Sequence, residues 1–276
     1  MKEVRILADS TCDLGRALTD KYNVDIIPLN IIMDDASYTD GEEINPDDIF
    51  RWADERKTTP KTAAVGMDRA EELLLKYPAD KYDIIFFGIS EEMSTTCNVV
   101  RLTADNLGLS NVHVIDSMNL SAGTGLLVLK ACRMAEEGMD AETIVRSIEG
   151  LRDRVRASFV VDTLTYLSRG GRCKAITALL ANRLHLHPMI EVEGGVMKVS
   201  RKYRGKIEKA LLEYAEDMRE KLLHADRTRV FITHSGCRDN VIEEIRSFVE
   251  SLGYFEEVLI TRAGGVISSH CGPGTL

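Results

Sequence analysis

The 276-residue sequence lacks the short motifs that mark common metal, disulfide and nucleotide sites. Its six cysteines include no CxxC pair and its six histidines no HExxH, so free thiols in a reducing compartment are expected rather than a zinc site or a disulfide framework. It has no GxGxxG, no GxxxxGK followed by Ser or Thr, and no GxSxG. A dinucleotide site, a P-loop and an α/β-hydrolase therefore lack their usual elements, and we expect no metal and no cofactor.

Positive charge and long apolar runs are also scarce. The chain has 35 Lys and Arg against 44 Asp and Glu, a formal net charge of -9, which argues against a nucleic-acid or anionic-membrane surface because either needs a basic patch. No run approaches the roughly 18 apolar residues of a membrane span, and the chain starts on a strand-like run instead of a signal peptide. These features predict a soluble, cytoplasmic protein.

Four apolar runs that each end on a serine are the most informative local feature: Val4–Ser10, Asp83–Ser90, Val112–Ser117 and Arg229–Ser235. Runs of this kind suit strands buried on both faces, and open α/β sheets bind ligands at the carboxyl ends of such strands. We therefore expect a cleft with Ser10, Ser90 and Ser117 on its rim, and do not expect Ser235 to contact the ligand. Ser10 has an alternative interpretation, because Ser10 and Asp13 have the spacing of a helix-capping box.

Helical periodicity alternates with these runs and changes character near residue 155. The expected helices of the first part are 13–22, 46–55, 68–76, 95–107 and 121–137. Beyond residue 155 we expect a hairpin over 189–199 that turns at Gly194-Gly195, followed by a long helix over 206–224. The chain then ends with a strand, a helix over 240–252 and a second strand. The fold class is thus α/β with two domains: residues 1–155 with a largely parallel sheet flanked by helices, and residues 156–276 with mixed structure. Residues 58–66 read as a mobile loop.

Two polar clusters are candidates for chemistry. Ser94-Thr95-Thr96 stands at an expected helix start, where it could receive an anion or merely cap the helix. The terminal stretch places His270 and Cys271 beside Ser268-Ser269 and a Gly-Pro-Gly turn. A Ser/His pair needs an orienting acid and an oxyanion hole to act as nucleophile and base, so anion binding, catalysis, a reactive Cys271 thiol and a structural turn all stay open.

Ordered motifs over nearly the whole chain resemble the DegV family, whose characterised members include the fatty-acid-binding subunit of bacterial fatty acid kinase. Residues 9–14 (DSTCDL) look like its opening D-S-T-x-D-L, and residues 38–41 (YTDG) like its Y-x-D-G. Residues 163–172 (TLTYLSRGGR) are similar to its T-L-x-Y-L-x-x-G-G-R, and residues 270–275 (HCGPGT) to its H-x-G-P-G-T. The order and spacing of the four motifs carry the resemblance.

The resemblance implies that one long-chain fatty acid lies between the two domains, with its tail in an apolar tunnel. Thr62 and Ser94 match the family positions that hold the carboxylate, and His270 lies close to the head group by the same likeness. Glu91 and Glu92 stand close to Ser94, and a carboxylate facing an anionic head group would disfavour its charged form.

The resemblance also implies that a separate ATP-dependent kinase subunit phosphorylates the bound acid, so that this chain is a lipid-binding protein and not itself an enzyme. Arg169, Arg172 and Arg204 match family positions near the pocket mouth and are candidates for docking that partner. Two rival functions remain. One is a stand-alone phosphotransferase or hydrolase that uses His270 with a nearby serine or Cys271, and the other is a lipid carrier or sensor without kinase contact.

Overall fold

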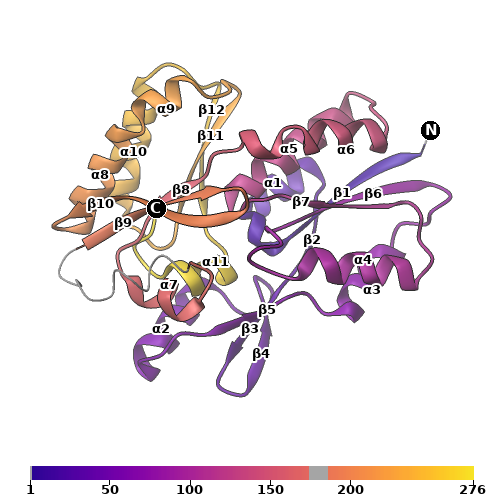
Figure 1. Cartoon of the computed structure of the whole chain (residues 1–276), viewed down its shortest axis with the longest axis horizontal. Helices are drawn as coiled ribbons and strands as arrows, with labels where there is room; N and C mark the ends of the chain where they lie inside the picture. The colour runs from indigo at the N-terminus through magenta and orange to yellow at the C-terminus, as the bar shows by residue number, and fades with distance from the viewer. Residues whose placement is uncertain (1, 174–185) are drawn as a thin grey trace.

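A four-stranded parallel sheet forms the centre of the first half of the chain (Figure 1). The computed structural model describes residues 2–173 and 186–276. The order of this sheet is β2-β1-β6-β7, with β1 at Glu3–Asp9, β2 at Asp25–Ile27, β6 at Tyr82–Gly88 and β7 at Val112–Asp116. The expected strands over 4–10, 83–90 and 112–117 are confirmed to within two residues at each end.

Helices cover both faces of this sheet, which explains why the central residues of β1 and β6 are apolar. Alternate side chains of a strand point to opposite faces. Ile6, Ala8, Ile85 and Phe87 pack against one helical layer, and Leu7, Ile84 and Phe86 against the other. The first layer contains α1 (Gly15–Tyr22), α5 (Ala122–Glu136) and α6 (Ala141–Glu149), and the second contains α3 (Met67–Leu75) and α4 (Thr96–Asn106).

A small antiparallel sheet of order β4-β3-β5 lies beside the main sheet, and the sequence did not indicate it. Its strands are β3 (Asn30–Met33), β4 (Ala36–Thr39) and β5 (Lys61–Ala63), and α2 (Pro46–Arg56) follows β4. The mobile loop expected over 58–66 was wrong, because its centre is β5, paired with β3 from Asn30↔Ala63 to Ile32↔Lys61. The partner strand lies about thirty residues earlier, beyond the reach of local pattern.

The second half contains two further sheets. An antiparallel sheet of order β10-β9-β8 consists of β8 (Ser158–Val160), β9 (Leu186–Glu193) and β10 (Val196–Arg204), and β9 and β10 form the expected hairpin. Its turn residues Gly194 and Gly195 have φ of 58° and 79°, as a tight hairpin of right-handed twist requires. The parallel pair β11 (Arg229–His234) and β12 (Glu257–Arg262) is joined by α10 (Asp239–Ser251).

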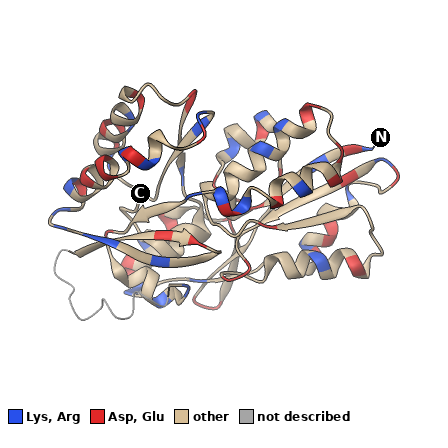
Figure 2. Cartoon of the chain, turned by 45° about the horizontal axis from the view of Figure 1, so that its top comes forward, with Lys and Arg blue, Asp and Glu red and all other residues tan. Residues whose placement is uncertain are grey.

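Shorter helices complete the described chain. The helix expected over 206–224 is divided into α8 (Ile207–Asp217) and α9 (Arg219–Leu223), which meet at Met218. The remaining elements are the 3-10 turns η1 (Ser10–Cys12) and η2 (Arg152–Arg154) and the helices α7 (Leu164–Gly170) and α11 (Gly265–Cys271). Within the described ranges, no helix has the length and apolar character of a membrane span. Acidic and basic residues are interspersed over both halves (Figure 2).

The last helix, α11, packs against the first half of the chain. It contacts α2, β3, β5 and η1 as well as α7, and Val266 packs into a core formed with Leu29, Ile31 and Ile49. The boundary expected near residue 155 falls in the link between η2 and β8. The segment that carries His270 is therefore attached to both halves of the molecule.

Candidate functional site

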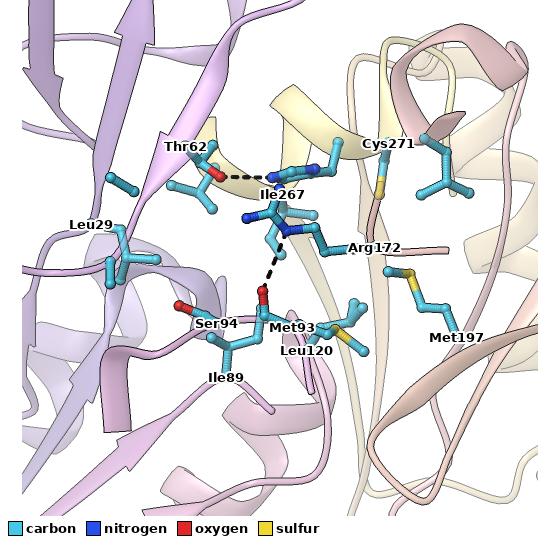
Figure 3. Close-up of a pocket in the computed structure, with 15 residues that line it drawn as sticks. Leu29, Thr62, Ile89, Met93, Ser94, Leu120, Arg172, Met197, Ile267 and Cys271 are labelled. Carbon is cyan, nitrogen blue, oxygen red and sulfur yellow. Dashed lines mark hydrogen bonds between the residues drawn. The ribbon is translucent and has the colours of Figure 1, made fainter. Parts of the chain in front are cut away.

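A small cavity of about 50 Å³ lies where β5, the loop before α4, the end of α7 and α11 meet (Figure 3). Thr62, Ser94 and His270, which come from three separate parts of the sequence, all line it. The rest of its wall, apart from Arg172, consists of apolar and small residues: Leu29, Ala63, Ala64, Ile89, Met93, Leu120, Leu167, Met197, Val266, Ile267 and Cys271. We call this cavity the head pocket.

Thr62 and His270 are joined directly. The Thr62 Oγ1 and His270 Nε2 atoms are 2.7 Å apart, and the pairing of Thr62 with Ile31 fixes the threonine on β5. Burial lowers the pKa of His270 to about 4, with the Arg172 cation as the second cause, so the imidazole is neutral at neutral pH. A neutral ring that donates from Nε2 leaves the Thr62 hydroxyl hydrogen free to bind an anion.

The other imidazole nitrogen of His270 is buried without a hydrogen-bond partner among the described residues. It lies against Gly170 in α7. No carboxylate is found within hydrogen-bonding distance of this ring in the described parts of the chain. The arrangement therefore lacks the orienting acid that a nucleophile and base pair requires.

Ser94 stands just before a helix start and also lines the head pocket. Its hydroxyl accepts a hydrogen bond from Thr96 N at 3.3 Å and shares another with Thr96 Oγ1 at 3.0 Å. Because α4 begins at Thr96, Ser94 supports a helix start and faces the head pocket at the same time. The amino end of this helix adds a favourable dipole for an anion.

Arg172 was expected near the pocket mouth as a residue that docks a partner. The structure puts it in the wall of the head pocket, with its guanidinium pointing toward the space between Thr62 and Ser94 (Figure 3). Its Nη1 donates to Gly170 O at 2.8 Å and its Nε to Met93 O at 3.4 Å. The side chain is exposed, so this end of the pocket reaches the surface and carries a cation.

The two other candidate docking residues lie outside the pocket wall. Arg169 is exposed in α7 and donates from Nη1 to Lys57 O at 3.4 Å. Arg204 is the last residue of β10, seven positions beyond Met197, which lines the pocket. At the rise of a strand this is about 23 Å from Met197.

Ser10, Ser90 and Ser117, which we expected on the rim of a cleft, do not line the head pocket. Each hydroxyl is engaged within the protein: Ser10 donates to Asp40 Oδ2 at 2.7 Å, Ser90 to Gly195 O at 2.7 Å, and Ser117 shares a hydrogen bond with Thr124 Oγ1 at 2.9 Å. The capping-box interpretation of Ser10 was also wrong, because α1 has no side-chain cap and follows Leu14. The serines at the strand ends therefore bond within the protein, whereas Ser94, in the loop that follows β6, lines the head pocket.

The groups around the head pocket suit the binding of an anion better than a reaction at the Cys271 thiol. Glu91 and Glu92 are exposed and absent from the pocket wall, and Glu91 forms an ion pair with Arg101 at 2.5 Å. Burial raises the pKa of Cys271 to about 12, helped by Asp13 and Cys173, so its thiol stays protonated. Among the residues that the structure describes, no group of three His, Cys, Asp or Glu could hold a metal ion.

A second, larger cavity of about 640 Å³ adjoins the head pocket, and Leu120, Ile267 and Cys271 line both. We call it the tail cavity. Its walls come from α5, β8, α8, α10 and β11, and its large apolar side chains include Leu126, Leu127, Phe159, Tyr214, Met218, Leu222, Phe231, Ile245, Val249 and Phe255. Ser235, which we did not expect to contact a ligand, is also part of its wall. A helix was expected over 121–137, where α5 lies, but the sequence did not indicate that it lines a cavity, because its apolar face reads as ordinary core.

Known proteins share this architecture over the full chain. A structure described as fatty acid binding of a DegV family protein from Thermus thermophilus superimposes with a TM-score of 0.89 at 30% identity, covering 99% of this chain and 97% of that one. A fatty acid-binding protein of Thermotoga maritima is 28% identical over 99% of this chain and 96% of its own length. A DegV domain-containing protein of Clostridium perfringens is 34% identical over 80% of each chain.

The model of the DegV family, whose description is an uncharacterised protein family, matches residues 3–276. The match covers every motif on which the resemblance was based. The chain belongs to the DegV family.

Proposed function

We propose that this protein binds one long-chain fatty acid, with the carboxylate in the head pocket and the acyl chain in the tail cavity. The observation that carries the proposal is the Thr62–His270 hydrogen bond of 2.7 Å in a pocket that also contains Ser94 and Arg172. Two hydroxyl donors and one cation suit a carboxylate. The shared wall of Leu120, Ile267 and Cys271 supports a continuous path from this pocket to the tail cavity.

The two cavities contribute differently to binding. Burial of about 15 methylenes at about 0.8 kcal/mol each gives roughly 12 kcal/mol of gross transfer free energy. Each hydrogen bond to a charged carboxylate contributes about 1.5–3 kcal/mol. The acyl chain therefore provides most of the affinity, and Thr62, Ser94 and Arg172 fix the orientation of the head group.

The fatty acid is then presented to a separate ATP-dependent kinase subunit. That subunit transfers the γ-phosphoryl group of ATP to a carboxylate oxygen, which forms an acyl phosphate and releases ADP. Exposure of Arg172 at the edge of the head pocket supports this step, because a carboxylate beside it is within reach of a partner. Arg169, Arg172 and Arg204 are the proposed docking cations.

Native mass spectrometry of the purified protein tests the binding proposal. We expect one fatty acid per chain in the wild type, and partial or complete loss of it in the double variant Thr62→Ala/Ser94→Ala. The matched control is Thr58→Ala/Ser147→Ala, since Thr58 is exposed and Ser147 bonds only to Thr143 O within α6. Equal lipid retention in both double variants removes Thr62 and Ser94 from the site.

Reconstitution with ATP and the catalytic subunit of a bacterial fatty acid kinase tests the presentation step. The variants Arg169→Glu and Arg204→Glu should lower acyl phosphate production while the lipid still co-purifies, because neither residue lines the head pocket. Normal production by both variants contradicts their role in docking. Binding of lipid without any acyl phosphate supports a carrier, and turnover of ATP by this chain alone supports an enzyme.

A further inference from the structure

Two buried aspartates from the first half of the chain hold the beginning of α11. Asp40 Oδ1 accepts from Gly265 N at 2.8 Å and Asp40 Oδ2 from Val266 N at 3.4 Å. Asp13 Oδ1 accepts from Gly264 N at 2.8 Å. Both side chains are only 4% exposed. Backbone amides at the start of a helix have no partner within the helix, and here the two aspartates supply the acceptors.

The glycines at this junction give the aspartates room. A Cβ atom on Gly265 would lie 2.6 Å from Asp40 Oδ1, and one on Gly264 would lie 3.2 Å from Asp13 Oδ1. Neither glycine has a positive φ, so close approach explains them and backbone conformation does not. The glycines on α11 and the aspartates of the first half therefore fit closely together at this junction.

The Asp40 contact leads directly to the head pocket through one small sheet. Asp40 follows β4, Thr62 lies on β5, and β3 pairs with both strands. His270 is five residues beyond Gly265 along α11, about 7.5 Å at the rise of a helix. The same sheet therefore binds the first turn of α11 through Asp40 and its last turn through Thr62.

We propose that Asp40 is a positioning residue for the ligand site: it fixes α11 on the β4-β3-β5 sheet so that His270 keeps its contact with Thr62 and the bound fatty acid is released slowly. The slow release rests on the proposed function, whereas the position of His270 does not. Among the described residues Thr62 is the only hydrogen-bond partner of the His270 ring, whose Nδ1 is buried without one. Gly170 packs against the ring from α7, and the first turn of α11 fixes the helix that carries it.

The donors around the two aspartates distinguish their roles. Asp40 receives three donors, the amides of Gly265 and Val266 and the hydroxyl of Ser10, and the Ser10 Oγ itself accepts from Leu29 N at 3.2 Å. Because the amides of Gly265 and Val266 can only donate and bond to different oxygens, both oxygens of Asp40 act as acceptors. Asp13 receives one amide and shares a hydrogen bond with the Ser121 hydroxyl, which can also accept. An asparagine side chain has one acceptor oxygen and one NH2 donor. At position 13 the oxygen can accept from Gly264 N while the NH2 donates to the Ser121 hydroxyl. At position 40 the NH2 would face a backbone amide that cannot accept.

The test compares Asp40→Asn with Asp13→Asn as its matched control. The imidazole nitrogens of His270 are observed by NMR in the delipidated protein, and the release of bound palmitate to albumin is timed. We expect Asp40→Asn to shift the His270 nitrogen signals and to speed release about tenfold or more, which corresponds to one lost hydrogen bond to a charged group. Asp13→Asn should keep the His270 signals and release palmitate within about twofold of the wild-type rate.

A second variant keeps the test decisive if Asp40→Asn does not fold. Ser10→Ala removes one donor and retains the carboxylate, so it should move the same His270 signals in the same direction by a smaller amount. Unchanged His270 signals in Asp40→Asn, or in Ser10→Ala if only that variant folds, overturn the proposal. Failure of the wild type to bind palmitate defeats the proposed function alone, because the imidazole signals still report the position of His270.

Discussion

Gly170 lies so close to His270 that a Cβ atom on residue 170 would stand 2.3 Å from the imidazole Nδ1. The same glycine accepts a hydrogen bond through its carbonyl oxygen from Arg172 Nη1 at 2.8 Å. The end of α7 therefore places the histidine and the cation of the head pocket together. Its glycine is explained by the space that the ring occupies, since its φ is not positive.

The variant Gly170→Ala should displace His270 and weaken retention of the fatty acid. An alanine in a helix is intrinsically favoured over glycine by about 1 kcal/mol, so a lower melting temperature indicates the clash and not the helix propensity. Gly150→Ala is the control, because its Cβ would meet its nearest neighbours at 3.6 Å, an ordinary contact. Lipid content by mass spectrometry and thermal unfolding of both variants check this, and equal behaviour of the two variants counts against the packing argument.

The sequence predicted three of the four strands of the main sheet, because these strands are largely apolar and buried on both faces. It did not indicate β2, which has only three residues. The β4-β3-β5 sheet was missed because its strands are three or four residues long and pair across a distance in the chain. Local periodicity contains no information on that pairing.

The candidate site depended on two different kinds of information. Thr62 came from resemblance alone, since an isolated threonine has no distinctive spacing. Ser94 and His270 were already candidates as members of polar clusters, and the resemblance added their expected contact with a head group. The helix that carries His270 was not predicted, because α11 has seven residues and its first amides are satisfied by Asp13 and Asp40, more than two hundred residues away. Strand-end serines indicated the correct region, but their hydroxyls bind other protein groups.

Removal of the Arg172 charge should raise the pKa of His270. Burial is the larger cause of the pKa of about 4, and the Arg172 cation is the second. In Arg172→Gln the pKa should therefore rise but stay below the usual value of about 6.5, because the ring remains buried. An NMR titration of the imidazole measures it, with Arg169→Gln as the control that should leave the pKa unchanged. An unchanged pKa in Arg172→Gln contradicts the placement of the guanidinium beside the ring.

Asp13 should make the folded protein less stable as the pH rises. Burial raises the pKa of Asp13 to about 8, and the nearby Asp40 and Asp9 carboxylates add to the effect, against hydrogen bonds from Ser121 and Gly264. The folded state then holds a proton that the unfolded chain has lost above about pH 4. Between these two pKa values the free energy of unfolding falls by about 1.4 kcal/mol per pH unit on account of this group.

Asparagine at position 13 cannot titrate and should remove this slope. Denaturant unfolding from pH 5 to 8 gives the free energy of unfolding of Asp13→Asn and of the wild type at each pH. The difference between the two proteins isolates the contribution of Asp13, because the contributions of Asp9, Asp40 and His270 cancel to first order. The thiols of Cys12 and Cys271 also face this site but stay protonated over that range, since burial raises the pKa of each. A difference that does not change with pH refutes the raised pKa of Asp13.

Cys271 should be unreactive in the native protein although it lines both cavities. Its side chain is 5% exposed, and burial, aided by Asp13 and Cys173, raises the pKa to about 12. Only the thiolate attacks an alkylating reagent, so very little of the reactive form exists at pH 8. Iodoacetamide labelling followed by peptide mass spectrometry should find residue 271 unmodified in the native protein and modified in denaturant. Rapid native labelling of Cys271 would favour the rival in which this thiol is a nucleophile, because that mechanism needs an accessible thiolate.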